Sequence, residues 1–312
     1  MLLRSVAATV AIILMNSTNV SSAPLTVDFY GDSTTAGAQT IGGKTILSTH
    51  SEPVIVHSGL KAHFGDDVVV NNFGIGGTQA LELLNGEMGY ELPWLERMKH
   101  SKADVVVLNY SWNDKEYYFN PVEGRTPVSP DEFAAALREL IFIARWAGKE
   151  VVLQDPNPGD FDFTKSDKLL QYIKAIHLVA ETENVPLVDN FEYVMSIPDW
   201  RTYLSEDKIH PTDALYAIKA KRTLETLIPI GQRIQEARAE DHEQESFEIT
   251  FSGLIYPIWM AAGTLGIKKV PTLMAKLSEP AVSWVLAQSE PAVSWVLAQS
   301  EPDFSQSVDQ AF

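Results

Sequence analysis

The chain has 312 residues, of which 45% are hydrophobic, enough to bury one sizeable core and leave material for an appendage. Its formal net charge of −17 argues against a nucleic-acid partner, because a polyphosphate ligand requires a concentrated basic surface that this sequence nowhere provides. The sequence contains no cysteine, which excludes disulfides, thiolate catalysis and zinc–thiolate sites.

The N-terminus has the layout of a secretory signal peptide. Arg4 precedes an uncharged apolar run, Val6–Met15, and small polar residues follow. Cleavage after Ala23 would remove residues 1–23, and cleavage after Ser22 is the alternative, because a proline otherwise becomes the first mature residue. A buried N-terminal helix is the competing interpretation. We therefore expect a secreted protein, periplasmic or extracellular.

Five apolar, β-rich runs follow and are predicted to be strands. Several are apolar almost without interruption, which is typical of strands covered on both faces. Helical patterns alternate with them, and this alternation predicts a parallel sheet with helices on both faces, with the site at the carboxyl ends of the strands. The predicted strands are Thr26–Tyr30, Val68–Asn71, Asp104–Tyr110, Glu150–Gln154 and Pro186–Val188.

Apolar spacing predicts the helices between these strands. Phe133–Ala144 places its apolar side chains on one face, and Gly148 lies where a C-terminal cap belongs. Thr164–Asp167 resembles a capping box that opens a second helix. A last helix is expected over roughly Pro211–Leu227, because proline is favoured at the first helical position.

Three segments follow a main domain of residues 24–232. Residues 233–248 are charged and are interpreted as a linker or an extension of the last helix. Residues 249–267 are uncharged and precede two lysines, which suits a membrane tether, but a proline and three glycines favour a packing segment. Residues 278–299 contain SEPAVSWVLAQ twice, too few units for a stacked solenoid. We assign the appendage, residues 249–312, no function.

A serine follows the first predicted strand in a tight turn. The alternating run Leu25–Tyr30 leads directly into Gly31–Ser33, and Gly37 comes soon after. A serine exposed in this way can act as the nucleophile in acyl transfer from an ester. The tripeptide alone is more typical of a helix N-cap. The chain has no G-x-S-x-G elbow, which disfavours the α/β-hydrolase fold.

A candidate base and acid for this serine lie together far downstream. Asp207 precedes His210 by three residues, and Pro211 disfavours the helical conformation for His210. The Asp207 carboxylate is then able to fix the tautomer of the imidazole. No H-x-x-x-H or H-E-x-x-H pair supports a metal site, so we expect neither metal nor cofactor. The histidines without an acidic residue at comparable loop spacing are His50, His57, His63, His100, His177 and His242.

Two further segments follow predicted strands and offer N–H groups. Asn71–Thr78 contains three glycines, which allow backbone N–H groups to turn toward a ligand. Asn113, in the segment Asn109–Asp114, can donate a side-chain N–H to a developing oxyanion, which is worth about 3 kcal/mol in comparable sites. Each segment alone is typical of an ordinary turn.

The order of these four segments resembles that of the SGNH, or GDSL, hydrolase superfamily. Gly31–Ser33 resembles its first block, Asn72–Gly77 the second, Ser111–Asp114 the third and Asp207–Pro211 the last. The resemblance spans roughly residues 25–230. The third block begins with serine where the family usually has glycine, a change that leaves the asparagine amide in place.

The resemblance implies a fold and five site roles. The fold is a three-layer α/β/α sandwich on a five-stranded parallel, flavodoxin-like sheet. Ser33 attacks the carbonyl, His210 takes its proton and returns it to the leaving alcohol, and Asp207 orients His210. The oxyanion is held by the backbone N–H groups of Ser33 and Gly77 and by the Asn113 side chain.

We therefore expect a secreted, metal-independent serine esterase acting on short-chain or acetyl esters. Its activity should rise with pH as His210 becomes neutral. The substrate is a small-molecule, glycan or lipid ester, and the alternative function is non-catalytic binding of a surface or glycan. Aromatic residues near the third block can stack on a sugar, line an acyl pocket or pack in the core: Tyr110, Trp112, Tyr117 and Tyr118.

Overall fold

The computed structural model describes residues 23–160 and 163–250. The predicted signal peptide (except Ala23), most of the apolar segment 249–267 and the repeat at 278–299 lie outside the described residues. The chain divides into two units, residues 1–239 and 240–312, and the second is described only over 240–250, as helix. Among the described helices, none has the length and apolar character needed to cross a bilayer.

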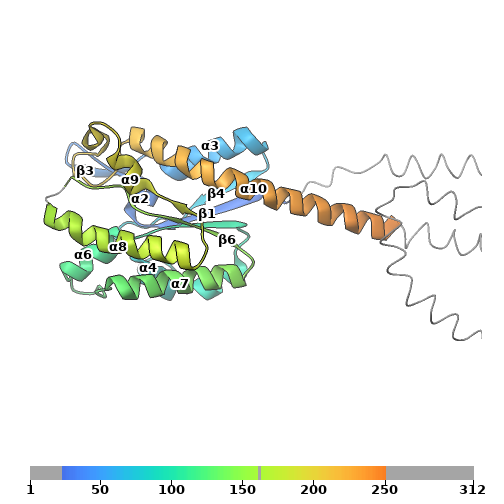
Figure 1. Ribbon diagram of the computed structural model, residues 1–312, viewed down its shortest axis with the longest axis horizontal. Helices are drawn as coiled ribbons and strands as arrows, with labels where there is room; N and C mark the ends of the chain where they lie inside the picture. Colours follow the sequence, from blue (N-terminus) through green and yellow to red (C-terminus); the bar gives the residue numbers. More distant parts are fainter. Residues whose placement is uncertain (1–22, 161–162, 251–312) are drawn as a thin grey trace, which may run out of the picture. The chain divides into compact units, whose positions relative to one another are not determined.

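A parallel sheet of five strands lies at the centre of the first unit (Figure 1). Its order is β4-β1-β5-β6-β7, so β1 pairs with β4 on one side and β5 on the other, which is the flavodoxin-like order. The predicted strands are confirmed to within one residue at each end. They are β1 (Leu25–Gly31), β4 (Val68–Asn72), β5 (Val105–Asn109), β6 (Glu150–Gln154) and β7 (Leu187–Val188).

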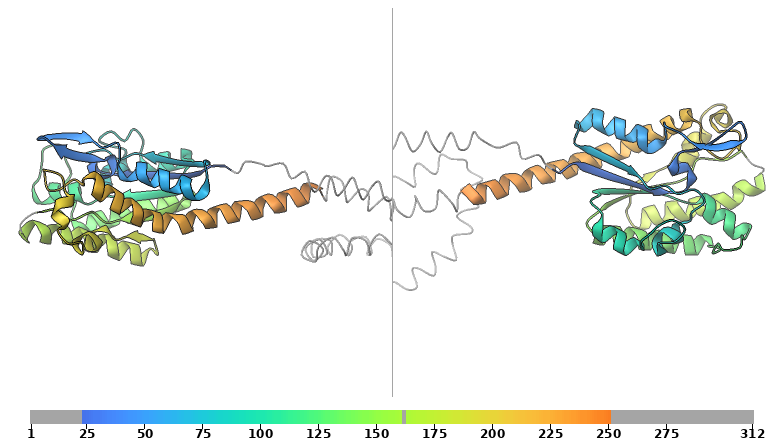
Figure 2. Two further views of the ribbon diagram at one scale, coloured as in Figure 1. Left: turned by 90° about the horizontal axis from the view of Figure 1, so that it is seen from above. Right: turned by 180° about the vertical axis from the view of Figure 1, so that it is seen from behind.

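Both faces of the sheet are buried, as its uninterrupted apolar strands predict. In β5, Val106 and Leu108 belong to one core cluster, while Val105 and Val107 belong to the cluster on the opposite face. The first cluster packs under α4 (Ala80–Asn85), α5 (Trp94–His100), α7 (Pro130–Trp146) and α8 (Phe163–Thr182). The second packs under α3 (Glu52–Phe64) and the first part of α10 (Asp213–Thr250), so the unit has three layers (Figure 2).

The long helices agree with the predictions at most, but not all, of their ends. α7 begins with a capping box at Ser129 and is followed by Gly148, whose φ of +75° suits glycine. α10 begins at Asp213, because Pro211 instead forms an antiparallel bridge with Leu204. It does not end near Leu227 but continues to Thr250.

A β-hairpin and several short helices were not predicted. Strands β2 (Ala38–Ile41) and β3 (Lys44–Leu47) pair antiparallel across Gly42 and Gly43, whose φ values are +59° and +70°. Two residues with positive φ are typical of the tight hairpin turn, so the Gly-Gly pair was a usable signal. The remaining elements are α2 (Ser33–Ala36), α6 (Trp112–Phe119), α9 (Asn190–Met195) and a 3₁₀ turn at Trp200–Tyr203.

Candidate active site

Ser33 lies at the carboxyl end of β1, as the first residue of the one-turn helix α2. Asp32 caps this helix: its carboxylate accepts hydrogen bonds from the Thr34 N–H and the Thr34 hydroxyl, both at 2.9 Å. A side chain at Gly31 would lie 2.1 Å from the Thr35 hydroxyl, so the approach of strand to helix requires glycine there. The turn that exposes Ser33 is therefore itself a capped helix N-terminus, with Asp32 as the capping residue.

His210 lies between Ser33 and Asp207. Its Nε2 is 2.8 Å from Ser33 Oγ, and its Nδ1 is 2.7 Å from Asp207 Oδ2. The histidine and aspartate side chains are 16% and 23% exposed, so water reaches both only in part. Three predicted residues separated by up to 177 positions in the chain thus form one hydrogen-bonded series.

Asp207 receives more hydrogen bonds than the sequence indicated. Its Oδ1 accepts from the backbone N–H groups of Ile209 and His210, both at 2.9 Å, and from the Ser205 hydroxyl at 3.2 Å. Its Oδ2 accepts from His210 and also from the Thr40 hydroxyl. Partial burial alone would raise the pKa of Asp207, but these hydrogen bonds outweigh burial and hold it well below its usual value of 3.8. The carboxyl is therefore ionised at neutral pH.

Asp207 and His210 lie on one segment, Leu204–Pro211, which is hydrogen-bonded to two other parts of the chain. We call it the acid loop. Glu206 accepts hydrogen bonds from the N–H groups of Gly42 and Gly43 at the hairpin turn, each at 2.8 Å. On the other side, Asn157 donates its side-chain amide to the Ile209 carbonyl at 2.9 Å. These contacts explain why the side chains of Asp207 and His210 keep one orientation although the backbone of the acid loop is irregular.

The predicted oxyanion glycine, Gly77, lies on a turn beside Ser33. We call Ile75–Thr78 the glycine turn. The Ile75 N–H donates to the Gly31 carbonyl at 2.9 Å, which joins this turn to the segment that carries Ser33. A Cβ built on Gly76 would lie 3.6 Å from Ser33 Cβ, and Gly77 has a φ of +79°. The structure thus places Gly77 near Ser33, in a conformation that favours glycine.

The predicted amide donor, Asn113, is joined to the same turn. It lies in the first turn of α6 and donates to the Thr78 carbonyl at 3.0 Å. Ser111, the residue before α6, has a φ of +152°, in the region that favours glycine. Its buried hydroxyl has no hydrogen-bond partner among the described residues. The usual glycine of the third block is therefore explained by backbone conformation, which Ser111 adopts at a cost.

Two carboxyl groups are buried close to the site. Burial raises the pKa of Asp32, against the hydrogen bonds from Thr34 and the positive charge of Lys219. Burial also raises the pKa of Asp114 to about 8, and the nearby Asp32 adds to this shift. Asp114 accepts from the Ala80 N–H at 3.0 Å. At neutral pH the Asp114 carboxyl is therefore largely neutral.

Two of the other histidines contact carboxylates from distant parts of the chain. His50 lies 3.4 Å from Asp213, and His177 Nε2 lies 2.9 Å from Asp155 Oδ2. Asp155, His177 and Asp189 hold potential ligand atoms within 4.8 Å of one another, a set that could hold a metal ion. Asp155 also accepts from two backbone N–H groups at the start of α9, at 2.6 and 3.0 Å. Sequence spacing missed the pair because Asp155 follows β6 while His177 lies on α8.

Comparison with known proteins identifies the family. A model described as the GDSL-like lipase/acylhydrolase family matches residues 29–218, more than half of the chain. The chain belongs to this family, which confirms the resemblance found in the sequence. It is a carboxylic ester hydrolase. A search of curated proteins gave no match.

Solved structures confirm the fold. An acetylxylan esterase from Geobacillus stearothermophilus is 24% identical with a TM-score of 0.51, over 64% of this chain and 93% of that one. A hydrolase from the metagenome of Lake Arreo, Spain, is 21% identical with a TM-score of 0.52, over 65% and 95%. A lipase/acylhydrolase from Enterococcus faecalis is 21% identical with a TM-score of 0.51, over 67% and 96%.

Proposed function

We propose that the protein is a secreted serine esterase that hydrolyses short-chain acyl esters, with Ser33 as nucleophile, His210 as base and Asp207 as the group that orients the base. The proposal rests on one observation. Ser33 Oγ lies 2.8 Å from one nitrogen of His210, and Asp207 lies 2.7 Å from the other. This is the arrangement that allows a hydroxyl to lose its proton as it attacks.

The reaction proceeds in two halves. A neutral His210 accepts the Ser33 proton at Nε2 while Oγ attacks the ester carbonyl, and it then protonates the leaving alcohol. Water attacks the resulting acyl-enzyme with the same histidine as base. Asp207, whose pKa is lowered by its hydrogen bonds against the effect of burial, stays ionised and stabilises the imidazolium. No metal takes part in these steps.

Three N–H groups are proposed to stabilise the oxyanion. The Ser33 N–H is the first of α2 and has no acceptor within the helix. The Gly77 N–H belongs to the glycine turn beside Ser33. The Asn113 amide has two N–H groups, and the one that donates to Thr78 leaves the other for the oxyanion. Loss of one such donor typically lowers kcat about 10²- to 10³-fold.

Substitution of the nucleophile tests the mechanism. The rate of p-nitrophenol release from acetate, butyrate and octanoate esters is compared for wild type, Ser33→Ala and Ser58→Ala. Ser58 is an exposed serine on α3 whose hydroxyl donates to the Val54 carbonyl of its own helix, so it is the matched control. We expect turnover in wild type and Ser58→Ala and a loss of at least about 10³-fold in Ser33→Ala. Activity retained in Ser33→Ala would refute the proposal.

The same assay tests the acyl group. We propose acetyl and other short acyl esters, in part because one solved structure of the same fold is an acetylxylan esterase. Acetylated xylo-oligosaccharides are therefore included beside the synthetic esters. Preference for octanoate over acetate would contradict a short-chain esterase while leaving the Ser33 mechanism intact. The family assignment favours this enzyme over the non-catalytic binding protein.

Secretion is proposed from the N-terminal sequence alone. Arg4 and the apolar run Val6–Met15 support export. Expression of the full chain, cell fractionation and N-terminal sequencing test it, with a mature N-terminus near Ala23 or Pro24 expected. Recovery of the uncut chain inside the cell would refute export. Release without detergent would argue against a membrane tether at 249–267.

A further inference from the structure

We propose that Tyr117 and Arg125 are positioning residues that fix the glycine turn, and with it the N–H of Gly77, for stabilisation of the oxyanion. The inference rests on the proposed function, because it takes Gly77 as an oxyanion donor. Neither residue belongs to the four motif segments.

Helix α6 contacts the glycine turn with two side chains one helical turn apart. Asn113 and Tyr117 are separated by four residues, so both lie on the same face of α6. The Asn113 amide donates to the Thr78 carbonyl at 3.0 Å, and the Tyr117 hydroxyl donates to the Gly77 carbonyl at 3.1 Å. Two successive peptide groups of the turn are therefore held by one rigid element.

The hydrogen bond from Tyr117 matters because it acts on Gly77 itself, while the bonds from Ile75 to Gly31 and from Asn113 to Thr78 hold the two ends of the turn. Within the glycine turn, the Ile75 carbonyl accepts hydrogen bonds from the Thr78 N–H at 3.3 Å and from the Thr78 hydroxyl at 2.8 Å, and both bonds join the ends of the turn. Gly77 lacks a side chain and has a φ of +79°, so its own packing does not restrict its backbone. Fixing the Gly77 carbonyl restricts rotation of the glycine and hence the direction of its N–H.

Arg125 packs against the ring of Tyr117. Its guanidinium lies 5.0 Å from the centroid of the Tyr117 ring, and its Nη1 is 2.7 Å from Glu82 Oε1. The arginine and glutamate side chains are only 17% and 5% exposed. Glu82 itself belongs to the capping box of α4, where its Oε2 accepts from the Gln79 N–H at 3.0 Å. Arg125 thus links Tyr117 to a second helix through a largely buried ion pair.

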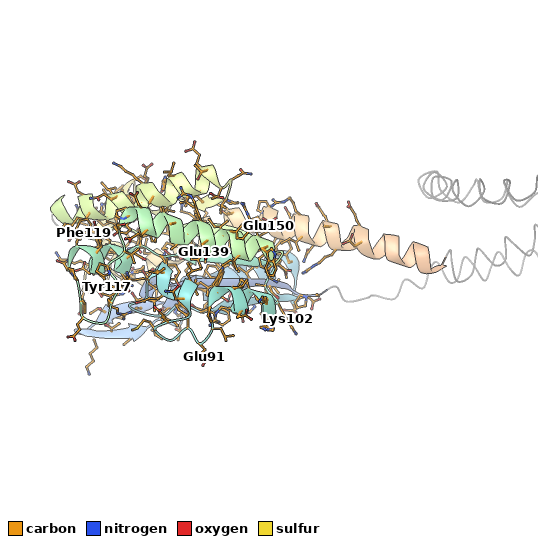
Figure 3. All side chains as sticks on the ribbon, turned by 90° about the horizontal axis from the view of Figure 1, so that it is seen from below. Glu91, Lys102, Tyr117, Phe119, Glu139 and Glu150 are labelled. Carbon is orange, nitrogen blue, oxygen red and sulfur yellow. The ribbon has the colours of Figure 1, made fainter. Side chains whose placement is uncertain are left out.

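Both groups lie directly against Gly77. A Cβ at this position would lie 3.4 Å from Arg125 Nη2 and 3.5 Å from the Tyr117 hydroxyl. Figure 3 shows Tyr117 at the end of the first unit opposite Lys102 and Glu150, which lie just before β5 and at the start of β6, so Tyr117 is at the carboxyl end of the sheet. Partial burial raises the pKa of Tyr117, so the phenol keeps the proton it donates.

Positioning predicts a specific kinetic effect. The oxyanion hole stabilises charge that develops in the transition state, and a misaligned donor lowers kcat more than it changes KM. Tyr117→Phe removes only the hydroxyl and leaves the contact from Asn113. We therefore expect kcat to fall about 10-fold while KM stays within about 2-fold of wild type. This loss in kcat is smaller than the loss that follows removal of an oxyanion donor itself. Inactivation by diethyl p-nitrophenyl phosphate, whose attack builds charge on the same oxygen, should slow by a similar factor.

The test uses the full chain with p-nitrophenyl acetate. Tyr118→Phe is the matched control, because Tyr118 is the next residue of α6, is 39% exposed and keeps its ring contact with Phe119 after the change. Arg125→Lys is the second variant: it keeps the positive charge but loses the planar group that covers Tyr117. We expect kcat and the inactivation rate to fall in both Tyr117→Phe and Arg125→Lys and to stay at the wild-type values in Tyr118→Phe.

Three results would overturn the inference or separate it from the proposed function. Tyr117→Phe and Arg125→Lys with wild-type kcat, in a protein that Ser33→Ala inactivates, would refute positioning and leave the esterase mechanism standing. A raised KM at unchanged kcat would mean that Tyr117 or Arg125 binds the substrate instead. Activity in Ser33→Ala would refute the proposed function and, with it, the role given to Gly77.

Discussion

The hydrogen bond from Thr40 to Asp207 yields the sharpest prediction about the site. Thr40→Val keeps the shape of the side chain and removes the hydroxyl that donates to Oδ2. Asp207 is only 23% exposed, so water replaces this donor poorly. A hydrogen bond to a charged group contributes about 1.5–3 kcal/mol, and we expect a loss of this size in the free energy of unfolding at neutral pH.

The stability loss should depend on pH in a defined direction. Because its hydrogen bonds outweigh burial, the pKa of Asp207 in the folded protein lies below its usual 3.8, so this group stabilises the fold at neutral pH and that stability is lost as the pH falls below 3.8. Thr40→Val raises the folded pKa toward 3.8. The difference between variant and wild type is therefore largest near pH 7, and it shrinks once the pH falls below the folded-state pKa of Asp207 in the variant, which itself lies below 3.8. Catalysis should fall about 3- to 10-fold, because Asp207 and His210 are held less firmly.

Urea unfolding near pH 7 and near pH 3, with ester hydrolysis at neutral pH, provides the measurements. Thr45→Val is the matched control, since Thr45 is the exposed partner of Thr40 across the hairpin. We expect Thr45→Val to stay within about 0.5 kcal/mol of wild type. Equal losses in the two variants, or a Thr40→Val loss that grows between pH 7 and pH 3, would refute the reasoning.

Three further changes test buried groups around the site. Ser111→Gly should raise the free energy of unfolding by about 1 kcal/mol and Ser111→Ala by less, because only glycine relieves the φ of +152°; denaturant titration measures both. Burial raises the pKa of Asp114 to about 8, so wild type should lose stability as the pH rises from 3.8 to about 8, and Asp114→Asn should lose less, because buried carboxyls such as Asp32 still contribute; thermal unfolding at pH 5 and pH 8 compares them. Lys219→Met leaves the buried Glu52, 3.0 Å away, without its counter-ion and should lower the free energy of unfolding by about 3–5 kcal/mol. Adding Glu52→Gln should restore part of this loss, and a double-mutant cycle measured by urea unfolding tests it.

The sequence predicted the features that depend on local pattern. The strands are apolar on both faces, and this property is visible in runs such as Val105–Leu108. The turn at Ser33 and the pairing of Asp207 with His210 follow from neighbouring residues, so their geometry was accessible from the chain alone. The order of the four segments supplied the long-range information that each segment lacks.

The missed features depend on contacts between distant residues. Thr40 contacts Asp207 across 167 positions, and no local pattern reports such a contact. From the sequence, Tyr117 is predicted only to stack on a sugar, line an acyl pocket or pack in the core, because its hydrogen bond to Gly77 requires the packing of α6 against the glycine turn. The hairpin is different, because Gly42 and Gly43 between two short runs are a local signal for a tight hairpin turn.

The hairpin joins the two halves of the site. Ser33 and Thr40 are separated by only seven positions, and the chain between them is short helix followed directly by β2. Thr40 then contacts Asp207, and Glu206 of the acid loop receives the N–H groups of the hairpin turn. Ser33 and the hairpin that supports Asp207 therefore belong to one continuous segment, so a change in the hairpin alters the separation of Ser33 from His210 as well as the hydrogen bonding of Asp207. This explains why irregular loops from distant parts of the sequence can hold the hydrogen bonds that join Ser33, His210 and Asp207.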